Sequence, residues 1–159
     1  MEKIASFKVD HLKLLPGLYV SRKDYVGLET ITTFDMRICK PNVDEVMDTG
    51  SIHTYEHLGA TFLRNHPVYK DQIVYFGPMG CRTGFYVIFS KDYESQDILS
   101  VINEMNDFVI DFVGEIPGAT SKDCGNYLDM NLEGAKKFAL KYKNEFLSNP
   151  KIEQLKYEF

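Results

Sequence analysis

The feature that most constrains the fold of this chain is an amphipathic segment at residues 51–64. Its apolar side chains recur every three or four residues, which predicts a helix with one buried face. The residues on this stripe are Ile52, Tyr55, Gly59, Phe62 and Leu63. We expect Asp48, Thr49 or Ser51 to cap the start of the helix.

The same segment carries two histidines, His53 and His57, spaced four residues apart. On a helix this spacing places both imidazoles on one face, one turn apart, as two ligands of one metal ion require. Glu56 lies between them, so the order is His-x-x-Glu-His, which is known from inverzincins. In that arrangement the glutamate acts beside the metal as a proton carrier. Such histidine pairs also occur on helices without a metal, so the segment alone leaves both interpretations open.

Length, charge and cysteine content narrow the class of protein. A chain of 159 residues is typical of one domain with a substantial core, so we expect a single domain over residues 1–159. A net charge of -5 disfavours a nucleic-acid partner. The absence of a membrane-length apolar run and of a signal-peptide core favours a cytoplasmic protein with no membrane partner. The three cysteines, Cys39, Cys81 and Cys124, are then expected to be thiols.

The clearest strand signal covers residues 30–39, where β-branched residues and alternation are typical of a half-buried strand. Phe34 and Met36 share one face of this strand. Asp35 and Arg37 share the other face. From the residues alone, the Arg37 side chain is a solvated charge or the partner of a neighbouring acid in a salt bridge.

The remaining pattern predicts the fold class. Alternation of polar and apolar residues predicts a strand at residues 6–11, and short apolar runs predict strands at 72–76 and 85–89. Polar residues predict a loop at 21–27. Helical spacing predicts two further helices, one from Ser95 or Asp97 to near Gly114, and one over 132–147 that is capped by Asn131. This order favours an α+β fold in which an antiparallel sheet has helices packed on one face. A homodimer is the simplest way to bury the other face.

Two of the cysteines lie on loops. Cys81 follows a turn with two glycines and a proline, at residues 77–80. A free cysteine is usually a small buried hydrophobe, but a nearby metal or base can lower its pKa and make it reactive. Cys124 lies on a polar loop beside Gly125, so its side chain is free to turn towards a partner.

A metal held by two histidines needs a third protein ligand if it is to be catalytic. His11, His66, a carboxylate or a thiolate could supply this ligand, and Cys124 is attractive because of its loop. Two imidazoles and one thiolate suit iron(II), zinc or cobalt, and argue against magnesium or calcium.

Several short blocks occur together in a characteristic order and spacing. They are His53-Thr54-Tyr55-Glu56-His57, Gly77-Pro78-Met79-Gly80-Cys81-Arg82-Thr83-Gly84, Cys124-Gly125-Asn126, Phe34-Asp35-Met36-Arg37 with Pro41-Asn42, and residues 6–11. With these blocks the chain resembles the S-ribosylhomocysteine lyase family, bacterial enzymes that make the precursor of autoinducer-2. The resemblance covers essentially the whole chain, and three reactive-site blocks together are highly specific.

The resemblance implies a homodimeric α+β fold with two sites at the subunit interface. It implies that His53, His57 and Cys124 bind one divalent metal ion per subunit, natively iron(II), with zinc or cobalt as substitutes.

It also implies the roles of five further side chains. Cys81 and Glu56 match the acid/base pair of the family. Ser6, His11 and Arg37 match positions that hold the ribosyl and homocysteine parts of the substrate.

Members of this family act on S-ribosylhomocysteine, a ribose thioether. They open the sugar, move its carbonyl group from C1 to C2 and then C3, and eliminate homocysteine, which leaves 4,5-dihydroxy-2,3-pentanedione. The implied reaction is non-redox, with the metal as a Lewis acid and a thiolate that moves protons between adjacent carbons. Two positions depart from the family pattern: Tyr75 stands where some members have an aspartate, and Met130 where a histidine is frequent.

Two other functions would use the same residues. An inverted-motif metalloprotease would use Glu56 to activate a metal-bound water, but that class takes a glutamate as third ligand and gives no role to Cys81. A non-catalytic metal-binding or metal-sensing protein would need a closed four-ligand site, with Cys81 as a candidate fourth ligand.

Overall fold

The protein is built on one four-stranded sheet with the strand order β1-β2-β4-β3. The computed structural model describes residues 1–158, so Phe159 of the expected domain lies outside the described residues. The strands are β1 (Gly17–Val26), β2 (Glu29–Arg37), β3 (Ile73–Pro78) and β4 (Gly84–Phe89). Each neighbouring pair runs antiparallel, as the order of strand signals in the sequence predicted.

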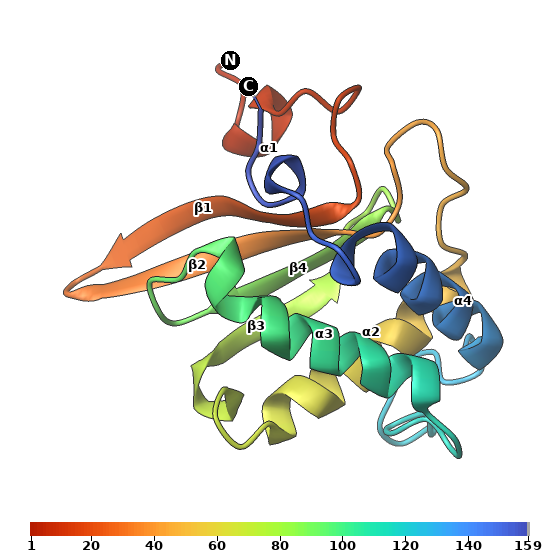
Figure 1. Cartoon of the computed structure of the whole chain (residues 1–159). Coiled ribbons are helices and arrows are strands. Elements are labelled where there is room, and N and C mark those ends of the chain that lie inside the picture. Colours follow the sequence, from red (N-terminus) through yellow and green to blue (C-terminus); the bar gives the residue numbers. More distant parts are fainter. Residues whose placement is uncertain (159) are drawn as a thin grey trace.

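Three long helices cover one face of this sheet (Figure 1). They are α2 (Thr49–Asn65), α3 (Ser95–Asp111) and α4 (Leu132–Tyr142), and a π-helical turn continues α4 over Lys143–Leu147. Short 3-10 turns lie at Lys70–Gln72 and Ile152–Gln154. The expected α+β class is confirmed. Within the described residues no helix is both long enough and apolar enough to span a membrane.

The two faces of β2 differ as alternation requires. Phe34 and Met36 are fully buried in the core that the sheet shares with the helices. Asp35 and Arg37 project from the opposite face, which we call the outer face, and they are only 2% and 3% exposed. A buried charged pair on the outer face is unusual, because buried charges are costly unless they are paired.

The metal-ligand helix α2 is fixed to the sheet by its apolar face. Its cap is Asp48, whose side chain accepts a hydrogen bond from the Ser51 amide at 2.9 Å. The Tyr55 ring packs 4.8 Å from that of Phe85, measured between centroids. Gly59 is required for close approach, because a Cβ atom there would lie 2.4 Å from the Phe76 ring.

The helices are also tied to one another by buried hydrogen bonds. The Tyr55 hydroxyl donates to Asn106 Oδ1 on α3 at 2.6 Å. Asn106 Nδ2 in turn donates to the Ala139 carbonyl on α4 at 2.9 Å. Asn131 caps α4 as predicted, and its side chain accepts from the Gly134 amide. These contacts fix which side of α2 faces outwards.

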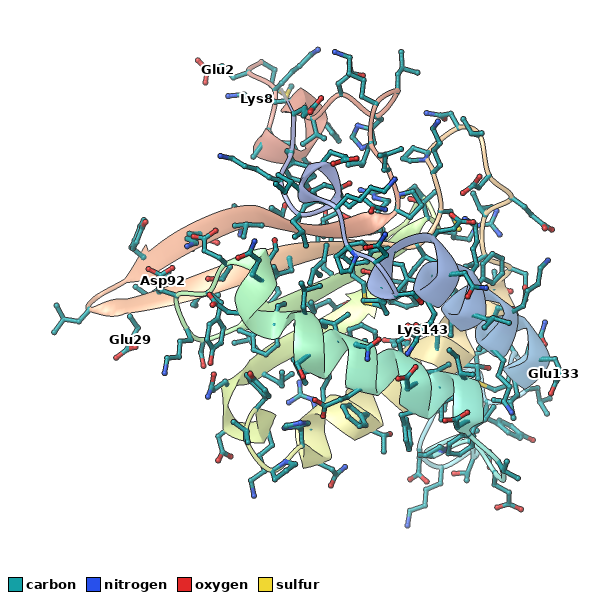
Figure 2. The ribbon with its side chains drawn as sticks, viewed as in Figure 1. Glu2, Lys8, Glu29, Asp92, Glu133 and Lys143 are labelled. Atoms are coloured by element: carbon teal, nitrogen blue, oxygen red, sulfur yellow. The ribbon has the colours of Figure 1, made fainter. Side chains whose placement is uncertain are left out.

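Two expectations about local structure are wrong. Residues 6–11 do not form a strand, because Ala5–Lys8 is the short helix α1 and a loop follows it. Alternation there had no neighbouring strand to pair with, and the Lys8 side chain projects into solvent (Figure 2). Residues 21–27 are not a loop throughout, because β1 continues to Val26, which pairs with Glu29. The β1–β2 hairpin extends beyond the core there, so residues 22–26 are mostly polar although they pair with β2.

Candidate active site

His53, His57 and Cys124 form a compact group of metal-binding atoms. One ligand atom from each lies within 4.8 Å of the others, and all three side chains are half-buried. The Cys124 Sγ is 3.4 Å from His53 Nε2. The two rings are 4.7 Å apart at 82°, so one helix face presents both imidazoles. The third ligand considered from the sequence, Cys124, is therefore the one that the fold brings to the histidines.

Hydrogen bonds fix the tautomers of both histidines. His53 Nδ1 lies 3.0 Å from the Asp129 carbonyl oxygen, and His57 Nδ1 lies 2.7 Å from that of Pro117. A carbonyl oxygen can only accept, so each Nδ1 carries the proton and each Nε2 keeps its lone pair. Such outer partners orient the rings of metal-binding imidazoles. The donor set therefore fits a divalent transition metal.

The loop that carries Cys124 is held by its own turns. The Cys124 amide donates to the Thr120 carbonyl at 2.9 Å. The sulfur accepts a hydrogen bond from the Asn126 amide at 3.4 Å. Gly118 has a φ of +72°, a left-handed conformation that glycine adopts easily, and it lies beside the His57 ring.

A second group of side chains surrounds Cys81 at the β3–β4 turn. Cys81 Sγ is 3.1 Å from the Thr83 hydroxyl oxygen and 3.9 Å from Arg37 Nη1. Arg37 Nη1 donates to the Thr83 hydroxyl at 2.6 Å, which leaves the Thr83 proton free to point at the sulfur. Arg37 also forms a buried ion pair with Asp35. The salt bridge considered for Arg37 from the sequence is thus confirmed, and its partner is Asp35.

These neighbours change the acidity of Cys81. Burial raises the pKa of the Cys81 thiol, but hydrogen bonds from Thr83 and the positive charge of Arg37 lower it by more. The net pKa therefore lies below the ordinary value, so more thiolate is present at neutral pH than for a free cysteine. The side chain is exposed on its turn, as a reactive thiol must be.

The two groups lie on different sides of the sheet. His53 and His57 lie on the side of α2 that faces away from the buried stripe packed on the sheet. Asp35 and Arg37 project from the outer face, and Cys81 contacts Arg37. Within residues 1–158, the His53–His57–Cys124 group contains no further histidine, cysteine or carboxylate, so Cys81 is not its fourth ligand in this chain.

Comparison with known sequences identifies the family. A family model described as S-ribosylhomocysteinase (LuxS) matches residues 4–153. The protein named S-ribosylhomocysteine lyase from Clostridium acetobutylicum is 57% identical over 157 residues, which cover 99% of each chain. The proteins of the same name from Clostridium beijerinckii and Borreliella burgdorferi are 56% and 50% identical, again over 99% of each chain.

The chain belongs to the S-ribosylhomocysteinase family. The resemblance drawn from the short sequence blocks is confirmed, and it extends over nearly the whole chain. Because the chain belongs to the S-ribosylhomocysteinase family, the His-x-x-Glu-His pattern of α2 is not that of an inverted-motif metalloprotease.

The structure places the other site residues predicted for an S-ribosylhomocysteinase as follows. Glu56 is half-buried on α2, one residue before His57. Ser6, on α1, lines a cavity of about 300 Å³ over the outer face, together with Tyr75. His11 lies in the loop after α1, where its Nδ1 is 2.9 Å from the Val9 carbonyl oxygen, and it does not line that cavity.

The two departures from the S-ribosylhomocysteinase pattern have structural places. Tyr75 is 45% exposed on β3, and its hydroxyl lies against Gly77. Met130 Sδ accepts a hydrogen bond from Thr54 at 3.5 Å, beneath the metal-ligand helix. Thr83 was not predicted to be functional, although its position two residues after Cys81 on the same turn places its hydroxyl within reach of the sulfur.

Replacing Thr83 with valine should raise the pKa of Cys81, because it removes a hydroxyl donor while keeping the shape of the side chain. Less thiolate is then present at neutral pH, so alkylation of Cys81 should slow roughly tenfold. The measurement is the pH profile of iodoacetamide labelling, read on the Cys81 peptide by mass spectrometry.

The matched control is Thr32→Val, which removes a buried hydroxyl that donates to the Lys91 carbonyl, away from Cys81. Its profile should equal that of the unmodified protein. An unchanged profile in Thr83→Val would show that the hydroxyl does not set the acidity of the thiol.

Proposed function

We propose that this protein is an S-ribosylhomocysteine lyase, which cleaves the thioether bond of S-ribosylhomocysteine to give homocysteine and 4,5-dihydroxy-2,3-pentanedione. One observation carries the proposal: a member of this family combines a His53–His57–Cys124 triad with a thiol of lowered pKa at Cys81. The relatives that bear the lyase name match 99% of the chain. We further propose that residues 1–159 act as one domain.

We propose iron(II) as the native metal, with zinc or cobalt as substitutes. His53 and His57 would bind it through Nε2 and Cys124 through its sulfur, a donor set that these metals share. Three protein ligands leave a coordination position for substrate, as in catalytic sites. The metal would supply a Lewis acid that draws electrons from a sugar carbonyl group.

The side chains of the protein supply the proton transfers. The Cys81 thiolate removes a proton from a carbon next to the carbonyl group and returns it to the neighbouring carbon, which moves the carbonyl along the sugar. Repetition brings the carbonyl to C3, next to the carbon that loses its proton in the last step. The electron pair of that carbon–hydrogen bond forms a carbon–carbon double bond as the neighbouring carbon–sulfur bond breaks. The sulfur leaves with its electron pair in homocysteine and takes up a proton, and the enol that remains tautomerises to the diketone. No electron is gained or lost overall, so the reaction is a non-redox elimination.

Three side chains have binding roles in this proposal. Ser6 at the outer-face cavity, His11 and Arg37 hold the ribosyl and homocysteine parts of the substrate. Arg37 also keeps the thiolate of Cys81 charged between transfers, because its guanidinium lies 3.9 Å from the sulfur.

Glu56 is proposed as the carrier of protons to and from the sugar oxygens. Glu56→Gln removes its ability to exchange a proton but keeps its size. We expect metal content and fold to be retained and turnover to fall by about 10²–10⁴, the usual contribution of a positioned acid or base. Homocysteine release and metal analysis on the same sample measure both quantities. Normal turnover by the variant would show that the acid/base assignment is wrong.

We also propose that the protein is a homodimer whose active sites lie between subunits. The metal triad lies on the outward side of α2, while Arg37 and Cys81 lie at the outer face of the sheet. Both groups have to meet one small substrate. A second copy that brings its outer face to the metal triad of the first satisfies this need and forms two equal sites by symmetry.

Mixed dimers test this arrangement directly. Cys81→Ala and Cys124→Ala should each be inactive alone. After unfolding and refolding together with metal, statistical mixing gives about half heterodimers by symmetry. Each heterodimer has one site with both residues intact, so about a quarter of the wild-type activity should return. If each site lies within one subunit, no activity returns.

The lyase activity itself is tested by thiol release. Anaerobically purified, iron(II)-loaded protein should release homocysteine from S-ribosylhomocysteine, as followed with a thiol reagent. A metal-replete protein that releases none would overturn the proposed activity and favour a metal-binding or sensing role.

A further inference from the structure

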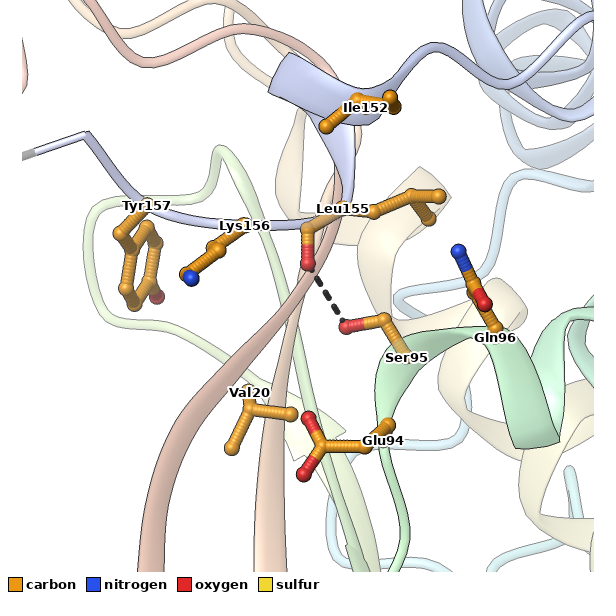
Figure 3. Close-up of a pocket in the computed structure, with 8 residues that line it drawn as sticks. All are labelled: Val20, Glu94, Ser95, Gln96, Ile152, Leu155, Lys156 and Tyr157. Carbon is orange, nitrogen blue, oxygen red and sulfur yellow. Dashed lines mark hydrogen bonds between the residues drawn. The ribbon is translucent and has the colours of Figure 1, made fainter.

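The C-terminal tail, residues 152–158, is fixed where it passes over β1. Gln154 is 5% exposed, and its Nε2 donates to the carbonyl oxygens of Pro16 and Glu145 at 2.8 and 2.9 Å. The Ser95 hydroxyl donates to the Leu155 carbonyl at 3.0 Å (Figure 3). These bonds set the path of the chain just before Tyr157.

Tyr157 reaches from this tail to the buried ion pair on the outer face. Its ring stacks on that of Tyr19, with centroids 4.7 Å apart and planes at 9°. Its hydroxyl donates to Asp35 Oδ2 at 2.7 Å. Burial and the negative charge of Asp35 raise the pKa of Tyr157, so the phenol remains a donor at neutral pH.

The Asp35 carboxylate accepts hydrogen bonds from both Tyr157 and Arg37. Oδ1 accepts from Arg37 Nε at 3.1 Å, and Oδ2 accepts from Arg37 Nη2 at 2.5 Å. The third nitrogen, Nη1, is the one that contacts Thr83 and Cys81. The tail is thus connected to the reactive thiol through two buried charged side chains.

We propose that Tyr157 is a positioning residue, which acts through Asp35 to hold the Arg37 guanidinium against Thr83 and the Cys81 sulfur. The effect on catalysis rests on the lyase function proposed above. The effect on the thiol does not, because it requires only the contacts of this chain.

The direction of the effect follows from the shared oxygen. The phenol takes up part of the negative charge of Oδ2, so Arg37 is not fully neutralised by Asp35. Without the phenol, Oδ2 attracts the guanidinium more strongly, and the positive charge felt at Cys81 decreases. Other ionisable groups that interact with Asp35 or Arg37 include Tyr19, Tyr86, Tyr142 and Cys39.

The test compares two tyrosine variants, each of which keeps the stacked ring and loses one hydroxyl. Tyr157→Phe removes the hydroxyl that donates to Asp35 and also contacts Ser21. Tyr19→Phe keeps the same stack and removes a donor to the Leu15 carbonyl, so it controls for loss of a buried hydroxyl. The measurement is the pH profile of iodoacetamide labelling at the Cys81 peptide, with unfolding in urea as a measure of stability.

We expect the half-maximal pH for Cys81 labelling to rise by about half a unit in Tyr157→Phe, a fraction of the effect of a neighbouring charge, and to stay constant in Tyr19→Phe. An unchanged profile in Tyr157→Phe, or an equal change in both variants, would overturn the proposal. Labelling needs no substrate or turnover, so absence of lyase activity in the unmodified protein would contradict the proposed function without affecting this result.

Discussion

Replacing Cys124 with alanine should abolish both metal binding and turnover. The variant leaves only His53 and His57, and two imidazoles on one helix do not complete a catalytic site, which takes three protein ligands. Metal content after equilibration with iron(II) should fall to a small fraction of one ion per subunit. Homocysteine release should fall by about 10³ or more, because Lewis-acid stabilisation of several kcal/mol is lost.

Two variants serve as controls for this result. Cys39→Ala removes a thiol that is buried in the core, and His66→Ala removes an imidazole that is paired with Glu104. Both should keep one metal ion per subunit, whatever they do to stability. Full metal occupancy in Cys124→Ala would mean that another side chain is the third ligand.

Replacing Cys81 with alanine should abolish turnover while the metal remains bound. Cys81 is not part of the metal group, so its loss removes no ligand. We expect homocysteine release to fall by about 10²–10⁴, the contribution of one positioned base. Cys81→Ser is expected to be nearly as inactive, since a hydroxyl is a far weaker acid than a thiol of lowered pKa.

Proton exchange gives a second measure of the same step. In deuterated water the unmodified protein should place deuterium on the sugar carbons of the substrate, and Cys81→Ala should not. Metal analysis of the same samples shows whether loss of activity is separate from loss of metal. Deuterium uptake at the unmodified rate in Cys81→Ala would show that a different group is the base.

The part of the site carried by α2 was predictable from the sequence because it depends on local periodicity. His53 and His57 share a helix face by their spacing alone, whatever the rest of the fold does. The strand pattern of β2 likewise placed Asp35 beside Arg37, and the pair is present. Cys124 can be the third ligand only if its loop folds back onto α2, which local sequence patterns do not predict. The sequence pattern therefore left Cys124 as one of several candidates, and the family resemblance selected it.

Contacts between distant parts of the chain were not predictable in this way. Tyr157 and Asp35 are separated by 122 residues, and no periodicity relates them. The main-chain carbonyl oxygens of Pro117 and Asp129 accept hydrogen bonds from His57 and His53. Every residue has a main-chain carbonyl group, so no residue type in the sequence predicts these contacts. The extent of β1 was missed for another reason, because a hairpin can extend beyond the core where polar residues are tolerated.

The ligands of the metal site come from two parts of the fold with different local stability. Both histidines stand on α2, which is anchored in the core through Tyr55 and Gly59. Cys124 stands on a loop whose backbone is held mainly by its own turns. Opening of that loop breaks few core contacts, so the ion can exchange with the surroundings by local opening while the domain stays folded. We therefore expect a metal ion bound by these three side chains to exchange at a rate set by the opening of this loop.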